Sequence, residues 1–185
     1  MAEYYLISQL PSLDGVGDGV PLPITEEAFL DLCRRFLKGR ALSEIEGLTL
    51  TPSPVSDEAL SPLIRAWNEG ERDLRIALAM ARAEKMNKSC DFAKKDLSAT
   101  LCKAASAALA VENPLEAEKF LLAHRLRFLE TLRPMDGFSQ EFLFYYGLKL
   151  KLLWRIRGFD SAQGKAAYQK IYSSIVDGDR WEVPK

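Results

Sequence analysis

The histidine content limits the catalytic chemistry open to this chain. His124 is the only histidine in the sequence. A Cys-His or Ser-His dyad would need this imidazole as its base, and a zinc site built on two histidines is impossible. The neighbours Arg125 and Arg127 disfavour the protonated form of His124. We therefore expect a packing or surface role for His124 and no catalytic residue in the chain.

A glycine-rich loop near the N-terminus is the second place where chemistry is conceivable. Asp14 to Gly19 resembles phosphate-binding loops superficially, but it lacks their Lys-Ser/Thr ending and no helix follows directly. It also fails as a calcium loop, because the twelfth position counted from Asp14 is Thr25, which has no carboxylate. We expect a plain loop here, with no metal and no cofactor.

A set of side chains suited to protein binding falls on one sector of a predicted helix. Trp67, Glu71, Arg75 and Arg82 follow one another at steps of 4, 4 and 7 residues, each close to whole helical turns. Aromatic and arginine side chains are enriched at interface hot spots, which favours a contact patch. The alternative is an exposed Glu71–Arg75 pair beside a half-buried Trp67.

The most apolar predicted helix begins at Ser139 and ends at Gly158. We expect its aromatic residues Tyr145, Tyr146 and Trp154 to lie in the core. Its basic residues fall in the second half, where cations favour a helix C-terminus. Two of them complete the candidate partner-binding set: Lys151 and Arg155.

Helices are the elements that must position these residues. Apolar periodicity, capping residues and prolines predict them over approximately 26–38, 62–86, 96–111, 114–132, 139–158 and 160–177, with Gly70 bending or dividing the second. Tyr4 to Leu10 is apolar enough for a strand but has only 48–50 as a short partner, so an extended arm is the alternative interpretation. The predicted fold class is all-α: a compact helical bundle or helical repeat with an extended N-terminal arm.

One proline-rich segment is the candidate boundary within the chain. Thr51 to Pro54 interrupts the helical pattern. This predicts an N-terminal arm, loop and first helix over 1–55 and a main helical domain over 56–185. One continuous domain over 1–185 is the alternative.

Composition and charge narrow the class of protein. The chain has 185 residues, a net charge of −1 and a pI near 6.0, which disfavour a dedicated nucleic-acid binder. Residues 1–60 carry a net charge of −6 and residues 61–185 a net charge of +5. Residues 1–5 lack the basic region and the long apolar stretch of a signal peptide, no run of about 18 apolar residues exists, and three cysteines fit no zinc spacing. We expect a cytoplasmic protein with reduced thiols.

Three stretches of the sequence carry a resemblance to a known family. They are Tyr4-Tyr5-Leu6 to Leu10-Pro11; Trp67 to Glu71 with Leu74-Arg75 and Arg82; and Tyr146 through Leu148-Lys149-Leu150 to Arg155, followed by Gly164. Together they resemble a bacterial family of unknown function whose genes lie among those for the subunits of V-type ATPases. The similarity spans most of the chain.

The resemblance implies a role without catalysis. The chain would be a non-catalytic subunit or assembly factor of a bacterial V-type (A/V-type) ATPase, such as the helical cap that links the rotor axle to the membrane ring. Its partners would be the central-stalk and membrane-ring subunits, through which it would reach the inner face of the cell membrane. We expect the basic residues Arg75, Arg82, Lys151 and Arg155 to meet an acidic partner surface. A generic helical protein-interaction adaptor unrelated to the ATPase is the alternative.

Overall fold

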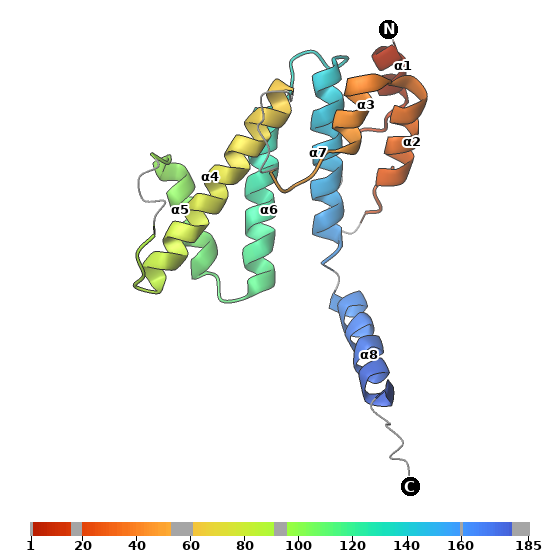
Figure 1. The fold of residues 1–185 in the computed structure, drawn as a ribbon. Coiled ribbons are helices and arrows are strands. Elements are labelled where there is room, and N and C mark those ends of the chain that lie inside the picture. Colours follow the sequence, from red (N-terminus) through yellow and green to blue (C-terminus); the bar gives the residue numbers. More distant parts are fainter. Residues whose placement is uncertain (1, 16–19, 53–60, 91–95, 160, 179–185) are drawn as a thin grey trace.

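The structure is a computed structural model that describes residues 2–15, 20–52, 61–90, 96–159 and 161–178. These residues form eight α-helices and no β-strand, so the predicted all-α class is confirmed (Figure 1). The helices are α1 (Ala2–Gln9), α2 (Glu26–Phe36), α3 (Gly39–Glu46), α4 (Pro62–Lys85), α5 (Ala99–Ala110), α6 (Pro114–Thr131), α7 (Gln140–Arg157) and α8 (Ser161–Gly178).

Local capping explains where most of these helices begin. Thr25 Oγ1 accepts the N–H of Ala28 at the start of α2, and Ser139 Oγ accepts the N–H of Phe142 at the start of α7. Side-chain caps of this kind satisfy N–H groups that have no partner within the helix. Asn113 caps α6 in the same way, with Pro114 in its first turn. The observed starts of α2, α6 and α7 at Glu26, Pro114 and Gln140 agree with the predicted ranges.

The N-terminal segment is a helix, so the predicted strand or extended arm is wrong. In α1, Leu6 is fully buried and Ile7 is 9% exposed, while Tyr4 and Tyr5 face outward. α1 packs against α2. A lone extended segment would leave its backbone N–H and C=O groups without partners, whereas a helix pairs them internally and still presents one apolar face.

The helical content between α1 and α4 also differs from the prediction. α2 ends at Phe36, two residues earlier than expected, and the short helix α3 was not predicted. Gly39 begins α3 with a φ of 61°, a left-handed conformation that glycine adopts without steric cost. Leu48 to Leu50, the candidate partner for an N-terminal strand, follows α3 as irregular chain, and Leu48 is buried.

α7 is the central helix of the bundle. It packs against α2, α3, α4 and α6, and its residues from Leu143 to Leu150 are all buried (Figure 1). Gly147 permits this close packing: a Cβ at that position would lie 2.9 Å from Leu48 and 3.2 Å from Phe29. The predicted burial of Tyr145 and Tyr146 is confirmed.

α4 is one continuous helix, and Gly70 does not divide it into separate elements. Gly70 is instead a position of close approach to α6, because a Cβ there would lie 2.3 Å from the ring of Phe128. Beyond this point α4 packs against α5 and α6 around a second, smaller core cluster, formed by Leu74, Ala77, Leu78, Ala105, Ala108 and Leu121.

The larger core cluster draws side chains from both sides of the proline-rich segment. Leu6, Phe29 and Ile45 come from the N-terminal helices, and Trp67 and Phe144 come from the later ones. Thr51 and Pro52 are described, whereas Ser53 to Leu60 lie outside the described residues, as does Asp160, where the last predicted helix begins.

Candidate functional site

An arginine–glutamate network on α4 contains two of the residues expected to bind partners. Glu71 lies in the interior, with its side chain 2% exposed. Its carboxylate accepts hydrogen bonds from Arg75 Nε at 3.1 Å and from Arg125 Nε and Nη2 of α6 at 2.9 and 3.0 Å. Two-point contact of this kind holds a guanidinium and a carboxylate in one plane. A buried carboxylate needs such partners, because taking it out of water is costly.

The same network reaches α7 and a third expected residue. Arg155 Nη2 of α7 lies 2.9 Å from Glu118 Oε1 of α6, and Arg125 Nη1 lies 3.8 Å from the same oxygen. Arg75 also donates to Thr51 Oγ1 at 3.4 Å. The structure therefore brings Glu71, Arg75 and Arg155 together across two helices, with Arg125 and Glu118 joining them from α6.

Sequence reasoning missed Arg125 and Glu118 because they lie 54 and 47 positions from Glu71, beyond any local spacing rule. One signal was available. Glu71 falls among the apolar positions Trp67, Leu74 and Leu78 of its helix, so its burial required a cation from another helix.

Trp67 belongs to the core, so the expected half-buried position is wrong. The residue is 1% exposed, and its ring stacks on Phe128 with centroids 6.1 Å apart. Its Nε1 is buried without a hydrogen-bond acceptor among the described residues. The Glu71–Arg75 pair exists as expected, but only Arg75 is exposed, with 47% of its side chain accessible. Trp67 and Glu71 therefore stabilise the interior of the bundle, and the arginines are the exposed members of the expected set.

The two remaining expected residues lie apart from this network. Lys151 is 20% exposed and pairs with Glu26 at the start of α2, which ties α7 to the N-terminal helices. Arg82 lies two turns beyond Arg75 near the end of α4 and is exposed. Within the part of the chain that the structure describes, Arg82 has no ion-pair partner. The four residues of the expected basic sector therefore lie in three places: Arg75 and Arg155 in the network, Lys151 beside α2, and Arg82 near the end of α4.

The largest uncovered apolar face among the described helices belongs to α8, which extends beyond the end of α7 and away from the bundle (Figure 1). Tyr168, Ile171, Tyr172 and Ile175 are 67%, 60%, 59% and 61% exposed. The rings of Tyr168 and Tyr172 stack on each other with centroids 6.1 Å apart. Scattered apolar side chains are normal on a protein surface, but a contiguous face marks an interaction site.

Trp154 lies on the surface, so its predicted place in the core is wrong. It is 40% exposed in the last turn of α7, close to the start of α8. The preceding residues of α7 pack against α2, α3, α4 and α6, whereas its last turn extends beyond α2 and α3, although α6 continues alongside it (Figure 1). Periodicity indicated correctly that the helix is apolar, but it did not indicate which of its residues the neighbouring helices cover.

A second charged cluster anchors the N-terminal loop to α6 and α7. Lys149 Nζ donates to Asp14 Oδ1 at 2.6 Å and to the hydroxyl of Tyr145 at 3.1 Å, and it lies 2.7 Å from Glu130 Oε1. Burial lowers the pKa of Lys149, but its hydrogen bonds to these groups outweigh burial and raise it. The hydrogen bond from Lys149 likewise holds the pKa of Asp14 below its usual range. Because these charges compensate one another, the cluster has a structural role.

His124 lines a cleft of about 490 Å³ between α4, the start of α5, and α6. Burial lowers the pKa of His124, and the neighbouring Arg125 and Arg127 lower it further. The imidazole is therefore neutral at neutral pH. The nearby carboxylate of Glu71 accepts hydrogen bonds from Arg125 and Arg75, and His124 forms no hydrogen bond with it among the described residues.

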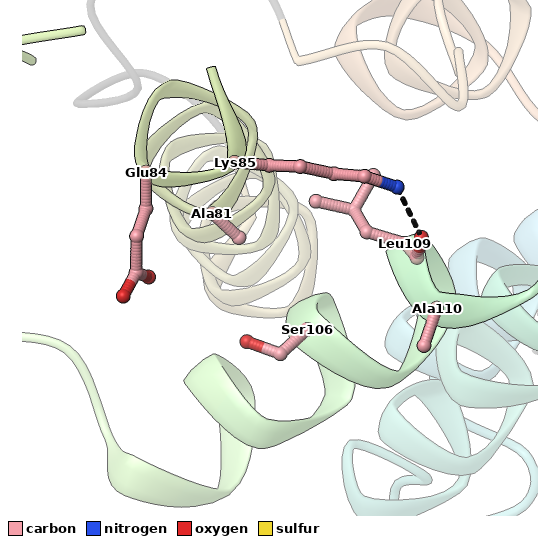
Figure 2. Close-up of a pocket in the computed structure, with 6 residues that line it drawn as sticks. All are labelled: Ala81, Glu84, Lys85, Ser106, Leu109 and Ala110. Atoms are coloured by element: carbon pink, nitrogen blue, oxygen red, sulfur yellow. Dashed lines mark hydrogen bonds between the residues drawn. The ribbon is translucent and has the colours of Figure 1, made fainter. Parts of the chain in front are cut away.

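A shallow hollow of about 330 Å³ lies between α4 and α5, and Figure 2 shows the six residues that line it. Lys85 crosses from α4 and donates to the backbone carbonyl of Leu109 at 3.2 Å. This carbonyl is close to the C-terminal end of α5, where helical C=O groups lack partners within the helix. The Lys85 ammonium group therefore serves as a helix cap.

The cysteines and the acidic residues show no metal site in the described part of the chain. No group of three or more potential ligands is found among those residues. Cys33 is buried, which raises the pKa of its thiol to about 12, and Cys90 and Cys102 are free thiols as well. Cys33 is therefore a core residue without nucleophilic character at neutral pH.

Comparisons with known proteins add no relative. No protein-family model matches the chain, and neither does any curated protein or any solved structure. Among the described residues, none of the helices has the length and apolar character needed to cross a bilayer.

Proposed function

We propose that this chain is a non-catalytic subunit or assembly factor of a bacterial V-type (A/V-type) ATPase, which takes the place of the helical cap between rotor axle and membrane ring. The ATPase assignment rests on the resemblance of the stretches around Tyr4, Trp67 and Tyr146. The protein-binding role rests on the surface of the molecule. Together they define a helical part that joins other subunits.

The observation that carries the proposal is the uncovered face of α8. Four large apolar side chains on this helix are each roughly 60% exposed to solvent. Covering one such side chain stabilises an assembly by about 1.5 to 3 kcal/mol when burial is complete. Tyrosine is also among the residues enriched at interfaces, because its ring is apolar and its hydroxyl remains able to form hydrogen bonds.

The exposed arginines support the same proposal, and Arg82 does so most clearly. Arg75 and Arg155 have about half of their side chains exposed, at 47% and 52%, while one edge of each guanidinium is held by Glu71 or Glu118. A guanidinium has five N–H donors, so a partner carboxylate can bind the outer edge. Arg82 is exposed without an ion pair among the described residues and is the clearest probe of an acidic partner surface.

The proposal is tested by purification of the assembled ATPase. A tag on this chain should bring down the central-stalk and membrane-ring subunits at low salt, and less of them at high salt, because exposed charges are screened beyond about 8 Å at physiological ionic strength. Arg82→Glu should weaken this association without a change in the circular-dichroism spectrum. The matched control is Glu84→Lys on the same helix, which reverses a nearby charge in the opposite direction. Recovery of partners that exclude every part of the ATPase would instead favour the generic adaptor.

A further inference from the structure

The exposed large apolar residues of α8 form one narrow stripe. Tyr168, Ile171, Tyr172 and Ile175 follow the spacing i, i+3, i+4 and i+7, which places them within a sector of about 100°. The stripe runs for about 10 Å along the helix axis at 1.5 Å per residue. Gly164 continues the same sector toward the N-terminus of α8, and a Cβ at that position would meet nothing within 4 Å. A partner can therefore come close to the helix backbone there.

This pattern fits a helix that enters a groove on a protein. Helices that bind in this way present anchors at i, i+3, i+4 and i+7. A helix that lies on a membrane surface has a broader apolar face and many Lys and Arg residues on its polar face. The residues from Gly164 to Ile175 contain only two cations: Lys165 lies beside the stripe, and Lys170 lies on the opposite side together with Ala166 and Ser173.

The size of the stripe argues against a second copy of α8 as the partner. Four side chains of this kind at roughly 60% exposure offer about 500 Å² to a partner. Two copies of α8 would then bury about 1,000 Å² in total, below the roughly 1,200 to 2,000 Å² of a stable interface. A groove between two helices also contacts the flanks of α8, so it covers more of the helix than a second copy of the stripe does.

The charge of α8 specifies the rim of the groove. Lys165 and Lys170 are the charged residues from Gly164 to Ile175, and both are exposed. Lys165 flanks the stripe, whereas Lys170 lies about 150° from its centre at 100° per residue, so Lys165 is the cation that acidic side chains on the rim would attract. Arg155, at the end of the preceding helix, adds a further exposed cation on the approach to α8.

From these features we infer that α8 is a docking helix, which inserts its Tyr168–Ile175 stripe into an apolar groove between two helices of an ATPase subunit whose rim carries Asp or Glu. This inference rests on the proposed function, because the ATPase supplies the partner. In this arrangement α8 attaches the bundle of α1 to α7 to the complex.

The test uses the full chain and the V-type ATPase of the organism that encodes it, purified from cells that lack this chain. Binding is measured by biolayer interferometry for the wild type, for Ile171→Gln/Ile175→Gln and for the matched control Ser173→Gln/Ser174→Gln. Both double variants place two glutamines at exposed positions of α8, and glutamine is a good helix former, so helicity is retained. We expect the stripe variant to bind at least about tenfold more weakly and the control to bind within about twofold of the wild type. Lys165→Glu should weaken binding about two- to fivefold.

Four other outcomes would overturn the inference in distinguishable ways. Equal binding by the stripe variant and the wild type rejects α8 as the docking helix and leaves the proposed function intact. No binding by the wild type rejects the proposed function itself. Two measurements on the chain alone test the competing occupants: light scattering that shows a dimer lost in the stripe variant would favour a second copy, and co-sedimentation with phosphatidylserine vesicles would favour a membrane surface.

Discussion

Removal of the charge of Glu71 should destabilise the bundle more than any other single change in the arginine–glutamate network. Glu71→Gln keeps the size of the side chain but removes the negative charge that faces Arg125 and Arg75. The carboxylate is 2% exposed and Arg125 is 13% exposed, so water cannot replace the lost charge. Arg125 would keep only Glu118, whose nearest carboxylate oxygen is 3.8 Å away.

The magnitude follows from burial. Breaking a buried ion pair by removing one partner costs about 3 to 5 kcal/mol, because the other charge stays buried without compensation. An exposed pair contributes at most about 1 kcal/mol. Arg75→Ala removes the exposed member of the network and should cost no more than this. For a protein of this size, about 1 kcal/mol lowers Tm by about 2 to 4 °C, so Glu71→Gln should lower Tm by about 6 to 20 °C.

The assay is urea denaturation followed by circular dichroism, with thermal melting as a second measurement. Glu84→Gln is the matched control, since it makes the same substitution at an exposed position of the same helix. We expect it to change the free energy of unfolding by less than about 0.5 kcal/mol. A loss below about 1 kcal/mol for Glu71→Gln would show that Glu71 is not the buried centre of the network.

Three further predictions concern packing and pH. Trp67→Ala should cost about 3 to 5 kcal/mol in denaturation, because the ring is fully buried, whereas Trp154→Ala should cost less than about 1 kcal/mol; equal losses would refute this placement. Gly70→Ala should destabilise the protein by about 1 to 3 kcal/mol, because the added Cβ would clash with α6. Gly164→Ala has open space around it and should raise helicity. A lower Tm for Gly164→Ala than for Gly70→Ala would contradict this packing. The pKa of Asp14 is lowered in the folded state. Its contribution to the free energy of unfolding is therefore present above the ordinary aspartate pKa of about 4 and is lost as pH falls through the lower folded value. Asp14→Asn should make the free energy of unfolding depend less on pH below about pH 5, and an unchanged dependence would exclude this contribution.

The later helices were predicted well because their signals are local. Ser139, Asn113 and Pro114 act within one turn of the helix that they begin, so no knowledge of distant residues was required. The apolar character of α7 was equally clear, and its aromatic residues Tyr145 and Tyr146 lie in the core. The all-α class follows from the sum of such signals.

The errors concern features that depend on distant parts of the chain. Leu6 and Ile7 suit a strand by composition, but the structure gives them a helical partner in α2, and no strand to pair with exists among the described residues. Trp154 has the same periodicity as the buried residues before it, yet its side chain is exposed, because α2 and α3 do not extend to the last turn of α7 (Figure 1). Periodicity identifies which residues share a face, and it does not identify what covers that face.

The candidate site was predicted in part for the same reason. The spacing of Glu71 and Arg75 indicated their ion pair, which the structure contains. The burial of Glu71 and its contact with Arg125 depend on how α6 packs against α4, which local spacing does not report. A consequence follows for charge tests: Arg75→Glu would place a carboxylate beside the buried Glu71, so Arg82→Glu is the better probe of a partner surface.

The most direct test of the central claim is the amount of this chain in the assembled ATPase. The complex is purified through a tag on another of its subunits, from cells that express either the wild type or Ile171→Gln/Ile175→Gln, and the chain is quantified by mass spectrometry against the tagged protein. We predict that the wild-type chain is present in constant proportion to the complex and that the folded variant is depleted from it. Absence of the wild-type chain from a complex that retains its other subunits would contradict the claim that this protein is part of the ATPase.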